Sequence, residues 1–355
     1  MKKLIIILLA VVVFASCENN NTKSNTENKK SNVSIAAAGA TFPMPFYNMA
    51  FKAYTQKSGI PVSYGGIGSG GGIRSLKDKV VDFGASDAFL NDAKMAEMPA
   101  PVVHIPTCSG AVVIAFNLDG INSIKLNPDV LTKIFMGKIT QWNDPQLTKL
   151  NPGINFPDAG IKVVHRSDGS GTTAIFSDYM SKISSDWKDQ IGAGKSLNWP
   201  VGMGAKGNPG VAGTISQTEG SIGYIGSEYA FAQKISFAFL QNQSGNFIEP
   251  SLESVSAAGN GEIPADTRIM LTNSTDPNAY PICGFTWIVL YKDQDFNGRT
   301  EEQAKETLKL LNWMLQPEAQ DIAKKVNYAP LPQNVVGMAK EILNSVTYDG
   351  KPLQY

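Results

Sequence analysis

A polar turn near the middle of the sequence separates a short β-branched run from a helical pattern. The turn contains Arg166, Ser170 and Thr172, with glycines at 169 and 171. A hydroxyl at a helix start satisfies free backbone N–H groups, and the remaining N–H groups and the helix dipole attract an anion. Arginine adds a planar fork of donors that suits a tetrahedral oxyanion. The turn therefore predicts an anion site, although a simple helix cap would use the same residues.

Two earlier stretches also place a polar turn before a helical pattern. Thr41 and Phe42 precede Pro43, which suits the first turn of a helix because proline lacks the N–H that is unpaired there. Ser69 lies in a glycine-rich turn at residues 65–72. This turn lacks the Gly-Lys-Ser/Thr ending of a P-loop, which argues against nucleotide binding. A flexible glycine hinge is the alternative to a ligand contact.

Asp87 ends another strand-like run. A carboxylate accepts hydrogen bonds, so it suits an anion that still carries a proton and repels one that is fully ionised. Beside an anion site, Asp87 would favour protonated phosphate over sulfate. A plain helix cap by Ser86 or Asp87 is an equally good interpretation of this stretch.

The composition describes a globular protein with more than one core. A chain of 355 residues exceeds what one hydrophobic core usually serves, so we expect two domains. Hydrophobic residues make up 43% and charged residues 17%, and the net charge of +0 does not favour a nucleic-acid surface. The sequence has two histidines and no zinc-ligand spacing, so we expect neither a metal nor a cofactor.

The N-terminus has the pattern of an exported lipoprotein. Two lysines precede Leu4–Phe14, an apolar run of eleven residues that is too short to span a bilayer. Small residues then precede Cys17, which predicts a signal peptide at 1–16 and a lipid on Cys17 that attaches the chain to a membrane. An ordinary secretory leader is the alternative. The polar stretch that follows predicts a flexible tether within residues 17–33.

Two long apolar runs at 102–117 and 282–291 flank a self-contained set of α/β signals. This order suggests an α/β protein in which one domain is inserted into another and two crossover strands act as hinges. We expect lobe I at 34–112 plus 276–355 and lobe II at 113–275.

Several local features add to this outline. The Pro/Gly-rich stretch at 195–213 predicts a loop. Thr300 and Gln303 form a capping-box pattern that predicts a helix start. Cys108 and Cys283 each follow a proline closely, and both a disulfide and a pair of buried thiols fit the pattern.

The turns described above resemble, in type and order, the phosphate-binding proteins (PstS) of bacterial ABC-type phosphate importers. The resemblance extends from about residue 35 to residue 355 and implies a type II periplasmic-binding-protein fold that encloses one phosphate ion between two lobes. It is carried by four motifs, at residues 39–43, 66–71, 82–87 and 166–172, and by shorter stretches at 137–139, 142–144 and 223–224.

The resemblance also implies roles for single residues. Asp87 would accept the phosphate proton, Arg166 would pair with phosphate oxygens, and Asp168 would orient Arg166. His165 and Gly70 depart from the usual family pattern, but neither position is an expected donor. The expected hydroxyl and backbone N–H donors are Thr41, Phe42, Ser69, Ser170, Gly171 and Thr172.

The function that the resemblance implies is transport without catalysis. The chain would be a monomer, lipid-anchored in the periplasm or at the cell surface, that delivers inorganic phosphate to the permease and ATPase subunits of an importer. A phosphatase is an alternative, but Asp168 replaces the first glycine of a Gly-x-Ser-x-Gly elbow around Ser170, and His104 and His165 are the available imidazole bases. A phosphate-sensing surface protein and a site for sulfate or molybdate are further alternatives.

Overall fold

The computed structural model of the chain describes residues 33–355. The predicted leader, Cys17 and the tether up to residue 32 lie outside the described residues. Among the helices of 33–355, none combines the length and the apolar character that crossing a membrane requires.

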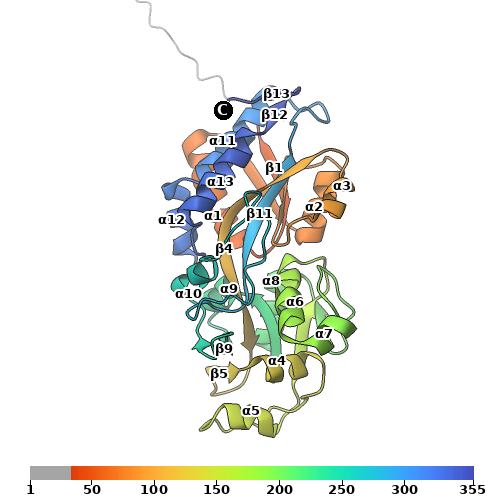
Figure 1. The fold of residues 1–355 in the computed structure, drawn as a ribbon, viewed down its shortest axis with the longest axis vertical. Helices are drawn as coiled ribbons and strands as arrows, with labels where there is room; N and C mark the ends of the chain where they lie inside the picture. Colours follow the sequence, from red (N-terminus) through yellow and green to blue (C-terminus); the bar gives the residue numbers. More distant parts are fainter. Residues whose placement is uncertain (1–32) are drawn as a thin grey trace, which may run out of the picture. The chain divides into compact units, whose positions relative to one another are not determined.

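Strands and helices alternate along most of the described chain (Figure 1). The first part contains β1 (Ile35–Gly39), α1 (Met44–Ser58), β2 (Val62–Gly66), α2 (Ser69–Lys77), β3 (Phe83–Ser86), α3 (Asp92–Ala96), β4 (Val102–Phe116), β5 (Ser123–Leu126), α4 (Pro128–Phe135), α5 (Pro145–Leu150), β6 (Lys162–Arg166), α6 (Gly171–Ile183) and α7 (Ser185–Gln190). The second part contains β7 (Met203–Ala205), α8 (Gly207–Gln217), β8 (Ser221–Gly226), α9 (Ser227–Gln233), β9 (Ser236–Gln241), β10 (Phe247–Ile248), α10 (Leu252–Ala258), β11 (Cys283–Tyr291), α11 (Glu301–Met314), α12 (Pro317–Lys325), α13 (Gln333–Asn344), β12 (Thr347–Tyr348) and β13 (Lys351–Pro352).

One mixed sheet runs through the protein in the order β2-β1-β3-β11-β4-β8-β6-β7, and β9 carries β5 and β10 at its side. Strands β1, β2 and β3 are parallel, as are β6, β7 and β8, whereas β11 and β4 run antiparallel to their neighbours. Parallel strands place their carboxyl ends at one edge of a sheet, so each parallel set directs its polar turns toward one edge. This is the α/β class that the sequence predicts.

Strand β4 belongs to both halves of the sheet. Within Val102–Ala111 every residue except Thr107 pairs with β11, and Val112–Phe116 pair with β8. Figure 1 shows helices α1–α3 and α11–α13 around the upper half and α4–α9 around the lower half. We call the first group, with β1–β3 and β11, lobe I, and the second, with β5–β10, lobe II. The predicted apolar runs are thus β4 and β11, while the exact residue bounds of the lobes stay a prediction.

The predicted loop at 195–213 is wrong in its second half, because α8 begins at Gly207. Glycines at 207, 210 and 213 lower helix propensity by about 1 kcal/mol each relative to alanine. Pro209 costs little, since it lies in the first turn, where its missing N–H has no helical partner. Packing compensates for the weak propensity: Val211, Ala212 and Ile215 are fully buried.

The two cysteines of the described residues are free, buried thiols. They lie on the neighbouring strands β4 and β11 but are not opposite one another: Cys108 faces Thr286 and Cys283 faces Ala111 in the strand register. Burial raises the pKa of both thiols. They therefore act as small apolar residues in the core, the second of the two predicted alternatives.

The capping box at the start of α11 confirms the prediction from the sequence. The Thr300 hydroxyl accepts a hydrogen bond from the Gln303 N–H, and the Gln303 side chain accepts one from the Thr300 N–H. The helix that follows buries Ala304, Leu308 and Leu311 in the core of lobe I.

We expect Thr300→Ala to lower the free energy of unfolding by about 1 kcal/mol, because it leaves helix N–H groups without the cap. Urea denaturation of both proteins measures this difference. Thr300→Ser keeps the hydroxyl and should stay close to the wild type. Equal stability of the alanine and serine variants would contradict the role of the cap.

Candidate functional site

The predicted site residues come together where the two lobes meet. The structure buries all eight proposed ligand-contacting residues. They occupy three helix N-termini and the ends of β3 and β6, since α2 begins at Ser69 and α6 at Gly171, and Thr41 and Phe42 precede α1. The sheet geometry thus brings together residues from motifs more than a hundred positions apart.

Ser69 connects three of these elements. Its hydroxyl oxygen accepts hydrogen bonds from the N–H of Gly171 (3.1 Å) and from the N–H of Asp87 (3.3 Å). Ser69 and Asp87 belong to lobe I and Gly171 to lobe II, so the site bridges the lobes. The backbone N–H of Gly70 adds a bridge to the carbonyl of Gly169 at 2.8 Å.

Position 171 requires glycine because Ser69 and Asp87 lie very close to its backbone. A Cβ atom at this position would lie 2.5 Å from both Oδ2 of Asp87 and Oγ of Ser69. No side chain fits in that space. Oδ2 of Asp87 therefore faces the N-terminus of α6.

Arg166 and Asp168 form a bidentate ion pair. The Arg166 Nε donates to Oδ1 at 2.7 Å and Nη2 donates to Oδ2 at 2.6 Å. Burial by itself would raise the pKa of Asp168, but the hydrogen bonds and charge of Arg166 lower that pKa below its usual range. The Arg166 side chain is 1% exposed, and its Nη1 donates to the hydroxyl of Thr172. Asp168 thus has the position of an orienting residue.

Asn208 is a site residue that the sequence did not reveal. Its side-chain amide donates to the hydroxyls of Thr41 (3.2 Å) and Thr172 (3.0 Å), and its backbone N–H also donates to Thr41. Asn208 lies in the first turn of α8, within the stretch predicted as a loop. An asparagine in a Gly/Pro-rich stretch resembles an ordinary turn residue, so no sequence signal distinguished it.

Three tyrosines hold the backbone before α1. The hydroxyls of Tyr64, Tyr229 and Tyr328 donate to the carbonyls of residues 40, 41 and 42 respectively. These donors come from β2, from α9 in lobe II and from the segment after α12. With the carbonyls engaged, the position of this turn relative to the site is fixed.

The hydroxyl oxygens of the site already accept hydrogen bonds from the protein. Ser69 and Thr41 accept from backbone N–H groups, Thr172 accepts from Asn208, and Ser170 accepts from the N–H of Thr173 at 3.0 Å. A hydroxyl has one hydrogen to donate and can accept at its lone pairs. The hydroxyl hydrogens of Thr41, Ser170 and Thr172 therefore remain available as donors to a ligand, whereas that of Ser69 is shared with the Asp87 carboxyl group.

Asp87 is the carboxylate of the site and is 1% exposed. Burial raises its pKa to about 7, against the lowering effects of the Thr286 hydrogen bond, the Arg166 charge, the Ser69 hydrogen bond and the Lys195 charge. Thr286 was not predicted, and its hydroxyl donates to Oδ1 at 2.7 Å. The site therefore combines several donors with one carboxyl group that titrates near neutral pH.

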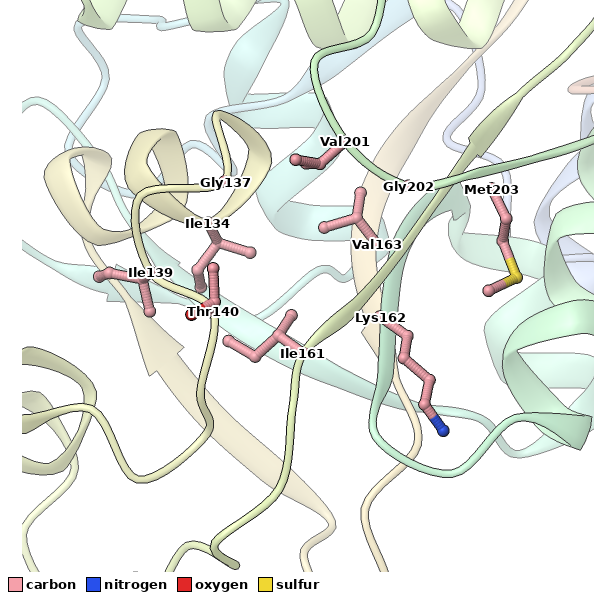
Figure 2. A pocket seen from close by; sticks show the side chains of 10 residues that line it. All are labelled: Ile134, Gly137, Ile139, Thr140, Ile161, Lys162, Val163, Val201, Gly202 and Met203. Carbon is pink, nitrogen blue, oxygen red and sulfur yellow. The ribbon is translucent and has the colours of Figure 1, made fainter.

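A separate hollow in lobe II contains none of the predicted site residues. It has a volume of about 290 Å³ and is lined mainly by Ile134, Ile139, Ile161, Val163 and Val201. Figure 2 shows that the Lys162 amine points away from the converging side chains of Ile134, Val163 and Val201. Its apolar walls are unsuited to a dehydrated oxyanion, which needs hydrogen-bond donors. Within residues 33–355, no group of three or more His, Cys, Asp and Glu side chains is placed to bind a metal ion.

Known proteins with similar sequences and structures bind phosphate. The model of the PBP superfamily domain matches residues 22–318. The phosphate-binding protein PstS of Xylella fastidiosa (strain Temecula1) is 39% identical over 323 residues, which cover 90% of this chain and 86% of that protein. The phosphate-binding protein PstS of Haemophilus influenzae is 41% identical over 312 residues, which cover 86% of this chain and 91% of that protein.

Solved structures agree with the fold. A high-affinity periplasmic phosphate-binding protein, PfluDING, matches with a TM-score of 0.67 and 19% identity, over 90% of this chain and 100% of that one. A phosphate-binding protein of Stenotrophomonas maltophilia matches with a TM-score of 0.66 and 16% identity, over 87% and 93% of the two chains. These matches confirm the two-lobed α/β architecture.

The raised pKa of Asp87 predicts a pH dependence of stability in the ligand-free protein. The folded chain retains a proton on Asp87 that the unfolded chain loses near pH 4. The associated stability is fully present below about pH 4 and is lost as the pH rises through about 7, with a slope of at most about 1.4 kcal/mol per pH unit. Thermal denaturation should show that the Asp87→Asn variant loses less stability between pH 4 and pH 7 than the wild type does.

The control is Asp119→Asn, the same substitution at an exposed position. It should retain the pH dependence of the wild type. If Asp87→Asn and Asp119→Asn lose stability in parallel over this range, Asp87 does not titrate as described.

Proposed function

This chain belongs to the family of PstS phosphate-binding proteins, and on that premise we propose that it binds inorganic phosphate and delivers it to an ABC-type importer. The observation that carries the proposal is the convergence of hydroxyl, backbone and guanidinium donors on one buried place that contains a single titrating carboxyl group. Binding involves no covalent step, so the protein is a transport component and not an enzyme.

The proposed ligand shell satisfies a buried dianion with hydrogen bonds and little net charge. A dehydrated anion is costly to bury unless donors meet its oxygen lone pairs. The hydroxyls of Thr41, Ser170 and Thr172 support this role because their oxygens already accept N–H bonds and their hydrogens remain free. The proposed donors are Thr41, Phe42, Ser69, Arg166, Ser170, Gly171 and Thr172, of which Gly171 would exchange its N–H bond to Ser69 for one to the ligand.

Asp87 is the proposed acceptor in this shell. Phosphate near neutral pH retains at least one proton, which a carboxylate oxygen can accept in a hydrogen bond, whereas sulfate has none. Oδ2 supports this role, since it faces the N-terminus of α6 while Oδ1 is occupied by Thr286. Asp87 thereby accounts for selectivity between two anions of similar shape.

Ligand entry requires the lobes to separate. Hydrogen bonds join Ser69 to Gly171, Gly70 to Gly169, and Thr41 to Asn208 across the interface between the lobes. A phosphate held among these groups has no route to solvent while the contacts persist. We infer a hinge motion about β4 and β11, the strands that connect the lobes.

A phosphatase is less well supported by the geometry. The Ser170 oxygen caps α6, and no hydrogen bond joins it to an imidazole among the described residues. His104 accepts the N–H of Leu90 at Nε2, and burial lowers its pKa to about 3, so it is a satisfied core residue. His165 is engaged with the carbonyl of Arg166 and stacks on Trp199. A phosphate-sensing protein would use the same site and differ only in its partner.

The most direct test is calorimetric titration of ligand-stripped protein. We expect one phosphate per chain and no heat with sulfate. Arg166→Met removes a buried charged donor and should weaken phosphate binding roughly 30- to 5,000-fold, which corresponds to about 2–5 kcal/mol. Arg74→Met, at an exposed arginine of α2, is the matched control and should bind like the wild type. If the ligand-stripped wild-type protein does not bind phosphate, the proposal is overturned.

We also propose that the chain is lipid-anchored through Cys17 outside the cytoplasmic membrane and works as a monomer. The leader pattern and the polar stretch after Cys17 support this location, and the periplasmic role of its family is consistent with it. The lobe bounds 34–112, 276–355 and 113–275 belong to the same proposal.

If Cys17 carries the lipid, the full-length protein should be found in the membrane fraction. Expressed with its own leader, the wild type should sediment with membranes and incorporate labelled palmitate, whereas Cys17→Ala should do neither. Cys108→Ala, at a buried thiol, should label like the wild type. Equal palmitate labelling of wild type and Cys17→Ala would exclude this attachment site.

A further inference from the structure

We propose that Thr286 is a positioning residue that keeps Asp87 a hydrogen-bond acceptor toward the ligand and thereby gives the site its selectivity for a proton-bearing oxyanion. The inference rests on the proposed function and deepens it. Thr286 lies on β11, is fully buried, and donates its hydroxyl hydrogen to Oδ1 of Asp87 at 2.7 Å. The two residues are 199 positions apart in the sequence.

The two oxygens of Asp87 have different surroundings. Oδ1 is directed to the Thr286 hydroxyl, and Oδ2 faces Gly171, where an added Cβ would lie 2.5 Å away. A donor on Oδ1 favours the charged carboxylate. It also fixes the rotation of the carboxyl group, which keeps Oδ2 directed at the N-terminus of α6.

A β-bulge between β4 and β11 lies beside Thr286 and helps to direct its hydroxyl group toward Asp87. The register between β4 and β11 shifts after Thr286: Thr286 pairs with Cys108 and Trp287 with Pro106, which leaves Thr107 without a partner strand residue. Bulges redirect side chains and are common beside functional sites. Pro106 suits this place because it has no N–H to contribute to the ladder.

Thr107, the bulged residue, forms a hydrogen bond with the backbone of Thr286. The hydroxyl of Thr107 donates to the carbonyl of Thr286 at 3.2 Å, and it lies 2.9 Å from the hydroxyl of Tyr47 on α1. A buried hydrogen-bonded chain thus runs from Tyr47 through Thr107 and Thr286 to Asp87. It connects the hinge strands to the carboxyl group of the site.

The hydrogen bond from Thr286 has a large effect on the pKa of Asp87. Burial raises the pKa of Asp87 to about 7, and the Thr286 hydrogen bond is the largest of the influences that lower it. Without that donor, Asp87 would retain its proton at neutral pH and could donate to a fully ionised oxyanion. The charge of Asp87 interacts with two cations, Arg166 and Lys195, and with one other carboxyl group, that of Glu228. Its remaining titratable neighbours are buried groups whose pKa is raised: Tyr47, Tyr64, Tyr229 and Cys108.

The test compares sulfate and phosphate binding in variants that differ by one hydroxyl. Thr286→Val preserves the shape of the side chain and removes the donor, whereas Thr286→Ser retains the donor. At pH 7 we expect the ratio of the sulfate Kd to the phosphate Kd to fall roughly tenfold or more in the valine variant, the equivalent of one pKa unit. The serine variant should keep the ratio of the wild type.

A second measurement needs no ligand. The carbon-13 NMR signal of the Asp87 carboxyl reports its titration, and its midpoint should rise by about one unit in Thr286→Val and remain unchanged in Thr286→Ser. Thr132→Val is the matched control, because that buried hydroxyl bonds within α4, to the carbonyl of Pro128. If Thr286→Val does not fold, Thr286→Ala provides the same comparison.

The outcomes separate this inference from the proposed function. An unchanged Asp87 titration and continued exclusion of sulfate in the valine variant would overturn the role of Thr286 and leave phosphate transport intact. A wild type that binds no phosphate would overturn the proposed function, and the NMR titration would still decide whether Thr286 controls the protonation of Asp87.

Discussion

The cost of removing polar groups from water is the constraint on which the site depends. Hydroxyl, amide, guanidinium and carboxyl groups are buried together between the lobes, and such groups are unfavourable there unless each has a partner. The protein meets part of this demand itself, since the hydroxyls of Ser69 and Thr41 accept N–H bonds from residues of the other lobe, and the hydroxyl of Thr172 accepts them within lobe II. Their remaining donors are the physical basis for binding an oxyanion.

The same constraint explains the use of helix N-termini. A protein with a net charge of +0 has no overall positive charge to attract an anion. The starts of α2 and α6 supply partial positive charge and N–H groups at the site. Arg166 is the one guanidinium at the centre of the described site, and its charge is largely balanced by Asp168. The site is therefore polar and directional, with little excess charge.

Strands β4 and β11, the proposed hinge, have a structural and a functional role at once. Strand β4 is part of both halves of the sheet, and β11 lies beside it, so both must bend when the lobes separate. Their bulge at Thr107 also holds Thr286 against Asp87. The two strands that connect the lobes therefore also carry the residue that positions the carboxyl group.

The sequence by itself determined the local elements and their chemistry: the hydroxyl- and glycine-rich helix starts, the long strands at 102–117 and 282–291, and the capping box at Thr300. These features depend on neighbours within a few residues, so composition and spacing reveal them. Only the tertiary structure decided the roles of Asn208 and Thr286, which contact partners 167 and 199 positions away. A short polar side chain carries no mark of a distant partner, because its hydrogen bond is set by how the sheet brings two strands or helices together.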